Sequence, residues 1–446
     1  MTMSLLLRHG LLAVGLGLLL SCGGGGGGSG GSMGLSAGGS GDAVNAGLLA
    51  PDANTGGDSG GPSGGGAAGA GGGTTTASGG DEGSGVGSGG TGVSTADATG
   101  VGAVDGAASI FVNGLRYATT GVAVDIEDAP SLQLGMSAKV TGPVSADFSR
   151  GVARRIESAA DLRGPMQSPD LAQGRFLVLG TTVTTDEATV WADSAGLAAL
   201  APGTTLQVWG LPAAPGVLLA TRIEQRGPSA PILSGTVQGL DTVRRTFMLG
   251  SMLVDYSLAS VAGSPDGRPL ANGAVVRVRA NSTPAANRLP ATQVQSWYPT
   301  PTADATLLQL AGVVTDFNGA QSFRVLGMQV DASAAELAGG PAAALGNGVR
   351  VEAAGVVSHG VLKASKLKLK HVPGTGGPAT FSLSGRVGNF DSAARFSVRG
   401  QPVDASTAAV VFANGNATML RNGVAITVEG ARVVNGVLIA TRVVFN

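Results

Sequence analysis

Cysteine, histidine, aromatic and charged residues are all scarce in this sequence. Its 446 residues include one cysteine, three histidines, 4% aromatic residues and 13% charged residues. A single cysteine excludes an intramolecular disulfide, so any folded core must be held together by packing. The net charge of −1 argues against binding through contacts to nucleic-acid phosphates, and we expect no nucleic-acid partner. Glycine, in contrast, is abundant, with 76 residues.

The charged residues that are present are unevenly distributed. No Lys or Arg occurs between Arg8 and Arg116, although six acidic residues lie within residues 42–97. Because Arg8 is the one basic residue before residue 99, the remainder holds 27 basic and 23 acidic residues. An excess this small does not indicate a polyanionic partner.

The single cysteine follows an apolar segment near the N-terminus. Arg8 supplies a positive charge, and residues 11–20 are apolar but too few to span a bilayer. Leu19-Leu20-Ser21-Cys22 resembles the bacterial lipobox, which implies a signal peptide over residues 1–21 and lipid attachment at Cys22. The alternative is an ordinary secretory signal with an incidental cysteine.

The lipobox resemblance also implies a location. A diacylglycerol on the Cys22 sulfur and an acyl chain on its amine would give stable membrane anchoring, which one chain alone does not. Gly23 follows the cysteine where aspartate could stand, and by resemblance to the enterobacterial sorting rule this favours the outer membrane. We therefore expect a lipid-anchored protein of the bacterial cell envelope.

Residues 22–98 form a stretch of low complexity. Residues 23–98 contain 32 glycines among 76 positions, and Ser, Thr, Ala and Asp make up most of the remainder. Such a composition buries too little apolar surface to offset its ordering entropy, so we expect a disordered tether. As a glycine-rich coil it would reach roughly 50 Å from the membrane.

One motif in this stretch is misleading. Gly57-Asp58-Ser59-Gly60-Gly61-Pro62 matches the segment around the nucleophile of chymotrypsin-like serine proteases. That chemistry requires a histidine base within hydrogen-bonding distance of the serine and an aspartate that orients the histidine. His9 lies in the expected signal peptide, and His359 and His371 lie far downstream. We therefore expect no catalytic residue and no enzymatic activity.

From residue 99 onward one short pattern recurs five times. It consists of Leu, two residues, Gly, six residues and then Gly or Ala. The five occurrences are Leu132–Gly142, Leu200–Gly210, Leu270–Ala280, Leu345–Gly355 and Leu420–Gly430. Recurrence at about 70 residues indicates one small folding unit copied in tandem. We number the expected copies one to five, over residues 99–160, 161–228, 229–301, 305–373 and 379–446.

Each copy carries the same series of short apolar segments. A Gly-x-Val-like opening is followed by a Phe-led run into a glycine, a variable loop or helical turn, the recurring pattern, and a closing segment such as residues 436–443. In copy five Val424, Ile426 and Val428 alternate with other residues, which is typical of a half-buried antiparallel strand. Four to five short strands in about 70 residues predict an all-β fold of tandem small β-barrels, OB-like or SH3-like.

The order of these segments resembles a known family. The series is similar to the bacterial lipoprotein repeat of domain-of-unknown-function family 5666. Its four motifs, in chain order, are Gly-x-Val, Phe-x-Val-x-Gly-x-x-Val-Asp, Leu-x-x-Gly-x-x-Val-x-Val-x-Gly and Gly-x-Leu-x-Ala-Thr-x-Ile/Val. The resemblance covers residues 99–446. It implies an envelope lipoprotein and brings no activity with it.

The copies retain apolar positions but not polar ones. Positions that alternate inward after the pattern glycine stay apolar, as at Val276 and Val278. The residue four positions after that glycine is expected to point outward, and it varies freely. In chain order it is Lys139, Gln207, Arg277, Glu352 and Thr427. A ligand site shared by all copies would keep one chemistry there, so the comparison favours a scaffold.

Several other side chains have both a binding and a structural interpretation. The lysines at positions 363, 366, 368 and 370 could form an anionic-lipid or polysaccharide patch, but we interpret them as a charged edge strand that prevents aggregation. Trp209 is expected to alternate outward, where it could stack on a sugar or base. Packing of Trp209 against the next copy is the preferred interpretation, as is a hydrophobic contact of Trp297-Tyr298 between copies three and four.

No metal or cofactor is expected. Asp125, Glu127 and Asp128 form a small acidic cluster without the spacing of a Ca²⁺ loop. His359 and His371 have no cysteine or carboxylate at ligand spacing. The sequence thus predicts a non-catalytic structural or interaction module that is anchored to the membrane through Cys22 and meets an envelope protein or glycan. The alternative function is carbohydrate or small-ligand binding on an OB-like face of individual repeats.

Overall fold

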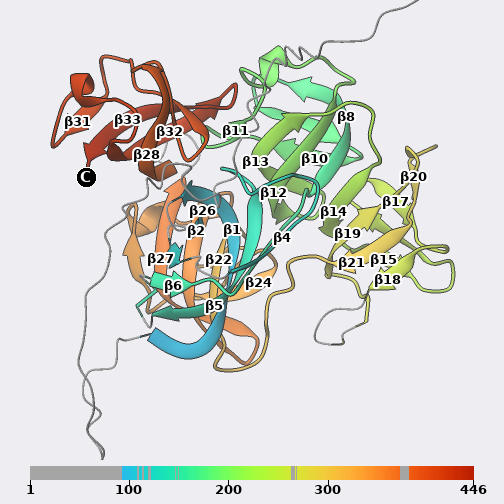
Figure 1. Cartoon of the computed structure of the whole chain (residues 1–446). Coiled ribbons are helices and arrows are strands. Elements are labelled where there is room, and N and C mark those ends of the chain that lie inside the picture. The colour runs from blue at the N-terminus through green and yellow to red at the C-terminus, as the bar shows by residue number, and fades with distance from the viewer. Residues whose placement is uncertain are drawn as a thin grey trace, which may run out of the picture. The chain divides into compact units, whose positions relative to one another are not determined.

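Among the residues that the structure describes, the regular elements are β-strands apart from three short 3-10 turns (Figure 1). The computed structural model describes residues 93–107, 110–112, 115–118, 122–145, 147–148, 150–262, 267, 269–371 and 381–446. Within these residues there are three short 3-10 turns and no α-helix, so the all-β prediction is confirmed. Cys22 and Ser59 lie outside the described residues. The first strand, β1, begins at Val93, so residues 93–98 of the expected tether belong to a strand.

The first three expected copies each contain a series of short strands. Copy one holds β1 (Val93–Ala107), β2 (Ile110–Val112), β3 (Leu115–Ala118), β4 (Ala123–Ile126), β5 (Ser137–Ser145), β6 (Arg150–Val152) and β7 (Arg155–Ser158). Copy two holds β8 (Leu162–Asp170), β9 (Arg175–Val178), β10 (Thr181–Thr184), β11 (Val190–Trp191), η1 (Leu197–Ala199), β12 (Thr205–Ala214) and β13 (Val217–Gln225). Copy three holds β14 (Ile232–Thr236), β15 (Gln238–Asp241), β16 (Thr246–Leu249), β17 (Met252–Asp255), β18 (Ser260–Ala262), β19 (Val275–Arg279), β20 (Arg288–Pro290) and β21 (Gln293–Ser296).

The last two copies follow the same series. Copy four holds β22 (Leu307–Thr315), β23 (Phe323–Val325), β24 (Met328–Asp331), β25 (Glu336–Ala338), η2 (Ala342–Ala344), β26 (Arg350–Ser358) and β27 (Val361–His371). Copy five holds β28 (Phe381–Ser392), β29 (Arg395–Val398), β30 (Gln401–Asp404), β31 (Val411–Ala413), η3 (Ala417–Met419), β32 (Ala425–Val434) and β33 (Val437–Phe445).

The recurring pattern forms the same turn in all five places. Its glycine has a φ of +80° at Gly135, and the other four lie between +85° and +88°, a region that glycine adopts without steric cost. The N–H of this glycine donates to a carbonyl of the opening strand, as from Gly423 to Val387 at 2.8 Å. The four equivalent bonds are Gly135 to Val104, Gly203 to Met166, Gly273 to Val237 and Gly348 to Val314. The pattern is therefore a turn that fixes the next strand against the opening strand.

The variable segment between the Phe-led run and this turn contains a short strand in every copy, which the sequence does not predict. In copies two, four and five it also contains a 3-10 turn, so the alternative of a helical turn is confirmed there. The strand pairs in parallel with the closing part of its own copy. The five pairs are β4 with β7, β11 with β13, β18 with β21, β25 with β27 and β31 with β33. Each of these variable-segment strands has two to four residues, which is too short to show alternation in the sequence.

The predicted row of separate small OB-like or SH3-like barrels is wrong. β1 pairs in parallel with β22 of copy four and with β28 of copy five, and β8 of copy two pairs with β14 of copy three. The hydrogen-bonded sheets therefore continue from copy to copy, and the largest has 19 strands drawn from copies one, four and five. The fold is a β-solenoid in which repeats are stacked as coils.

The apolar core follows the same grouping of copies. One cluster combines copies one and five, a second combines copies two and three, and a third is formed mainly by copy four. A unit of about 70 residues buries a thin core by itself, so stacking on neighbours supplies the missing burial.

Candidate functional site

The most variable polar position of the repeat lies where copies meet. Four residues after the pattern glycine, Gln207 and Arg277 are 0% exposed and Glu352 is 8% exposed. In these three copies the position is therefore closed to solvent, although it lies on the outward face of its own copy as expected. Alternation along a strand separates its two faces, but it cannot reveal that another copy covers the outer one. At Gln207 and Arg277 the differing residue meets another copy, whereas Lys139 and Thr427 make their polar contacts within their own copies.

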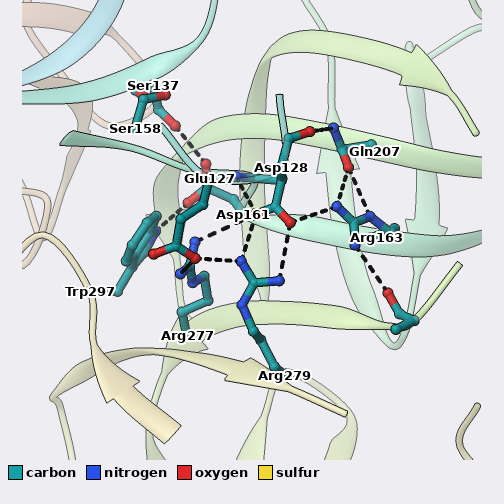
Figure 2. A network of polar contacts seen from close by, with 12 residues as sticks. Glu127, Asp128, Ser137, Ser158, Asp161, Arg163, Gln207, Arg277, Arg279 and Trp297 are labelled. Atoms are coloured by element: carbon teal, nitrogen blue, oxygen red, sulfur yellow. Dashed lines mark hydrogen bonds and ion pairs between the residues drawn. The ribbon is translucent and has the colours of Figure 1, made fainter. Parts of the chain in front are cut away.

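The largest such contact is a polar network, shown in Figure 2, that joins copies one, two and three. We call it the Asp161 junction. It consists of Glu127, Asp128, Ser137, Ser158, Asp161, Arg163, Gln207, Arg277, Arg279 and Trp297. Its side chains come from the ends of β4 and β7, from β5, β8, β12 and β19, and from the residue after β21.

One half of the junction pairs the acidic cluster of copy one with arginines of the other two copies. The Arg277 and Arg279 guanidiniums both donate to Glu127 Oε2, at 2.6 Å each. Arg163 Nη2 donates to Asp128 Oδ1 at 2.7 Å. Burial opposes ionisation of Asp128, but hydrogen bonds and charges from Arg279 and Arg163 outweigh it and lower the pKa of this carboxyl. The acidic cluster is therefore occupied by arginines, which leaves it no role as a cation site.

The other half of the junction is centred on the buried carboxylate of Asp161. It accepts from Ser137 Oγ of copy one at 2.7 Å, from the Gly210 N–H of copy two at 2.8 Å and from Trp297 Nε1 of copy three at 2.6 Å. Asp161 is 0% exposed, so all its bonds are made inside the protein. One side chain thus holds three copies together.

Trp297 and Tyr298 contact neighbouring copies, through polar atoms as well as through the predicted hydrophobic contact. Their rings stack with centroids 4.3 Å apart, and the Arg277 guanidinium lies 4.0 Å from the Trp297 ring centroid. The Tyr298 hydroxyl donates to the Ser137 carbonyl oxygen at 2.9 Å. Tyr298 also packs against the apolar cluster formed mainly by copy four, so the predicted hydrophobic contact between copies three and four is confirmed. The polar contacts with copies one and two are not predicted from the sequence.

Asp161 is expected to make stability depend on pH. Burial raises its pKa from 3.8 to about 6, against the opposing effect of its three hydrogen-bond donors and Arg277. The folded state therefore binds a proton more tightly than the unfolded chain between these values. The contribution of Asp161 should be most favourable below about pH 4 and decline, by on the order of 3 kcal/mol, as pH rises through 6. Urea unfolding from pH 4 to 8 measures this slope, and Asp161→Asn should flatten it; an unchanged slope in that variant contradicts the assignment.

A second buried ionic cluster joins copies one, two and four. Lys370 Nζ lies 2.9 Å from Glu352 Oε1 and 3.7 Å from Asp105 Oδ2. Arg350 Nη1 lies 3.7 Å from Asp186 Oδ2 of copy two. Burial alone would lower the pKa of Lys370, but the two carboxylates raise it.

This cluster corrects the interpretation of the lysines as a charged edge strand. β27, which carries them, is paired on both sides, with β26 and with β24 and β25. Lys370 is paired inside the protein, and Lys363 pairs with Asp331 at 2.9 Å. Lys370 therefore contributes to a contact between copies one and four, and Lys363 pairs within copy four.

The buried Trp209 ring has the structural role preferred from the sequence. It is 0% exposed and belongs to the apolar cluster of copies one and five, not to that of its own copy. A packing role is therefore confirmed, but the ring packs mainly with copies one and five and not with the predicted next copy, copy three. The ring points away from the core of its own copy, as expected, but other copies cover it. No sugar or base can reach this ring in the folded protein.

Two serine hydroxyls lie beside groups that can accept or exchange a proton. Ser137 is hydrogen bonded to Asp161 but is 0% exposed, so a substrate cannot reach its hydroxyl. His359 is exposed and lies beside the Ser358 hydroxyl, with Nδ1 3.1 Å from Oγ. In the part of the chain described, no three His, Cys, Asp or Glu side chains are grouped so as to hold a metal ion. Among the same residues, no helix is long and apolar enough to cross a membrane.

Two cavities lie at contacts between copies. The smaller, of about 190 Å³, borders the Asp161 junction and is lined by residues of copies one and three, including Glu127 and Trp297. The larger, of about 760 Å³, lies where copies two, three and four meet. Its lining mixes apolar groups such as Pro212 and Met328 with polar ones such as Arg324 and Gln329.

Comparison with known proteins found one family. Three segments match the family model described as "Domain of unknown function (DUF5666)", over residues 163–224, 311–368 and 384–444. These segments fall within expected copies two, four and five; copies one and three are not matched. A comparison with curated proteins found no match.

Proposed function

Since the chain belongs to the DUF5666 family, whose description assigns no activity, we propose its function from its own residues. We propose that it is a lipid-anchored envelope protein and that its stacked repeats form a non-catalytic structural or interaction module. The observation that carries this proposal is the burial of the varying polar residues. Gln207, Arg277 and Glu352 differ in chemistry, and each is buried. Gln207 and Arg277 bond to copy one, and Glu352 pairs with Lys370, whose amine also lies near Asp105 of copy one. The polar residues that could have made a shared binding face instead hold the array together.

Anchoring is proposed at Cys22, from its lipobox-like setting and from its being the single cysteine of the chain. A folded array on a tether of roughly 50 Å would stand clear of the lipid surface and present its outer faces to envelope partners.

Cys22→Ala should abolish lipidation and release the protein from membranes. Expression in a bacterial host with labelled palmitate, followed by membrane fractionation, measures both effects. Ser21→Ala is the matched control because it keeps a small residue before the cysteine and should remain labelled and sedimentable. Labelling that persists in Cys22→Ala would exclude this anchor.

A second candidate function is favoured by the larger cavity. Its volume of about 760 Å³ and its mixed lining suit a carbohydrate or another neutral small molecule. A ligand-dependent rise in melting temperature that disappears in Gln329→Ala would support binding there. Arg175→Gln, an exposed change outside the cavity, is the control.

A further inference from the structure

Copy five differs from the other copies at three related positions, all of which are arginine. Arg386 follows the opening glycine, Arg399 ends the Phe-led run, and Arg421 follows the pattern leucine. None of copies two, three and four has a charged residue at these places. The equivalent residues are Thr236, Leu249 and Ala271 in copy three, Val313, Leu326 and Gly346 in copy four, and Pro165, Leu179 and Ala201 in copy two.

The structure supports this equivalence residue by residue. Arg386 pairs with Ala425 across β28 and β32, as Thr236 pairs with Val275 across β14 and β19. Gly385 lies against the Arg399 side chain, and the glycine at the same place in each of the other three copies lies against the leucine of its copy. The arginines thus replace uncharged residues on an otherwise retained backbone.

The fold also brings the three arginines to one part of copy five. Arg386 Nη1 donates at 2.8 Å to the carbonyl of Gly423, two residues after Arg421. Arg399 Nε donates at 3.0 Å to the carbonyl of Ser384, two residues before Arg386. Arg386 and Arg421 are exposed and Arg399 is half-buried. Each of the two bonds uses one N–H, which leaves further donors on both guanidiniums.

No described acidic side chain forms an ion pair with these three arginines of copy five. In copy three, Arg277 and Arg279 are paired with the acids of copy one. In copy five, Arg395 pairs with Asp391 and Arg442 lies 3.9 Å from Glu429, whereas Arg386, Arg399 and Arg421 form no ion pair with any described residue. The small basic excess of residues 99–446 conceals this local surplus, because acidic residues are concentrated in copies one and two.

We propose that Arg386, Arg399 and Arg421 form a binding site for phosphate groups. Guanidinium is charged at all physiological pH values and offers paired planar donors that match phosphate oxygens. A phosphate group can accept hydrogen bonds from more than one guanidinium, which suits three arginines on neighbouring segments of copy five. The same chemistry is displayed by lipid headgroups and by free phosphate or pyrophosphate. This site does not depend on the proposed anchor or on the scaffold role.

The test compares two triple variants in the full chain carrying Cys22→Ala, so that a lipid anchor cannot contribute. R386T/R399L/R421A installs the residues of copy three and should fold because that copy does. R395Q/R432Q/R442Q removes the same charge from elsewhere in copy five. Co-sedimentation with vesicles of phosphatidylglycerol in phosphatidylcholine, and calorimetric titration with pyrophosphate, measure the two sources. Circular dichroism and melting temperature verify folding.

One outcome is that R386T/R399L/R421A binds phosphatidylglycerol vesicles at least about tenfold more weakly than the parent chain, while the control variant keeps nearly the parent's affinity. This outcome supports the site with a lipid headgroup as its ligand. The same pattern with pyrophosphate and not with vesicles supports it with a soluble phosphate. Equal losses in the two folded variants overturn it, because they indicate a general charge effect. Absence of binding by the parent chain to either probe also overturns it.

Discussion

Asp161→Ala is expected to lower the free energy of unfolding by about 3–5 kcal/mol. The change leaves three buried donors without their acceptor, namely Ser137 Oγ, the Gly210 N–H and Trp297 Nε1. It also removes the negative charge that faces the fully buried Arg277. Chemical denaturation at pH 7 measures the loss.

Two companion variants make this result specific. Asp161→Asn keeps one acceptor and nearly the same volume, so it should cost less than Asp161→Ala. Asp170→Ala removes an aspartate of the same copy whose ion pair with Arg175 is exposed, and we expect a loss within about 1 kcal/mol. Equal, small effects of Asp161→Ala and Asp170→Ala would mean that the junction does not hold the copies together.

The local structure of each copy can be predicted from the sequence. The pattern glycine, the apolar alternation after it and the closing segment correspond to a positive-φ turn, a core strand and a final strand in the structure. These features depend on interactions between residues that are close in sequence or on opposite faces of one strand. Periodicity and turn chemistry report such interactions directly.

The arrangement of the copies cannot be predicted in the same way. Pairing of β1 with β22 and β28 joins residues more than two copies apart, and nothing in a single sequence marks which copies are neighbours. The Asp161 junction escapes prediction for the same reason. Its acidic cluster is visible in the sequence, but the arginines that occupy it lie in other copies.

One signal for the junction is nevertheless present in the sequence. Gln207, Arg277 and Glu352 interrupt core strands with polar groups that differ from copy to copy. Free variation at one position suggests exposure to solvent. In an array whose copies contact different neighbours, however, equivalent positions face different partners, so variation also marks a contact between unlike surfaces.

Trp209→Ala is expected to destabilise the protein by about 3–5 kcal/mol, as for other large buried aromatic residues. The ring is 0% exposed and fills the apolar cluster of copies one and five from a strand of copy two, so its removal opens a cavity between copies. Trp209 Nε1 is buried with no hydrogen-bond partner among the described residues. Trp209→Phe removes that unpaired donor while keeping most of the apolar volume, so it should cost much less than alanine. Denaturant unfolding of both variants tests this ordering; equal losses would mean that the ring does not contribute through packing between copies.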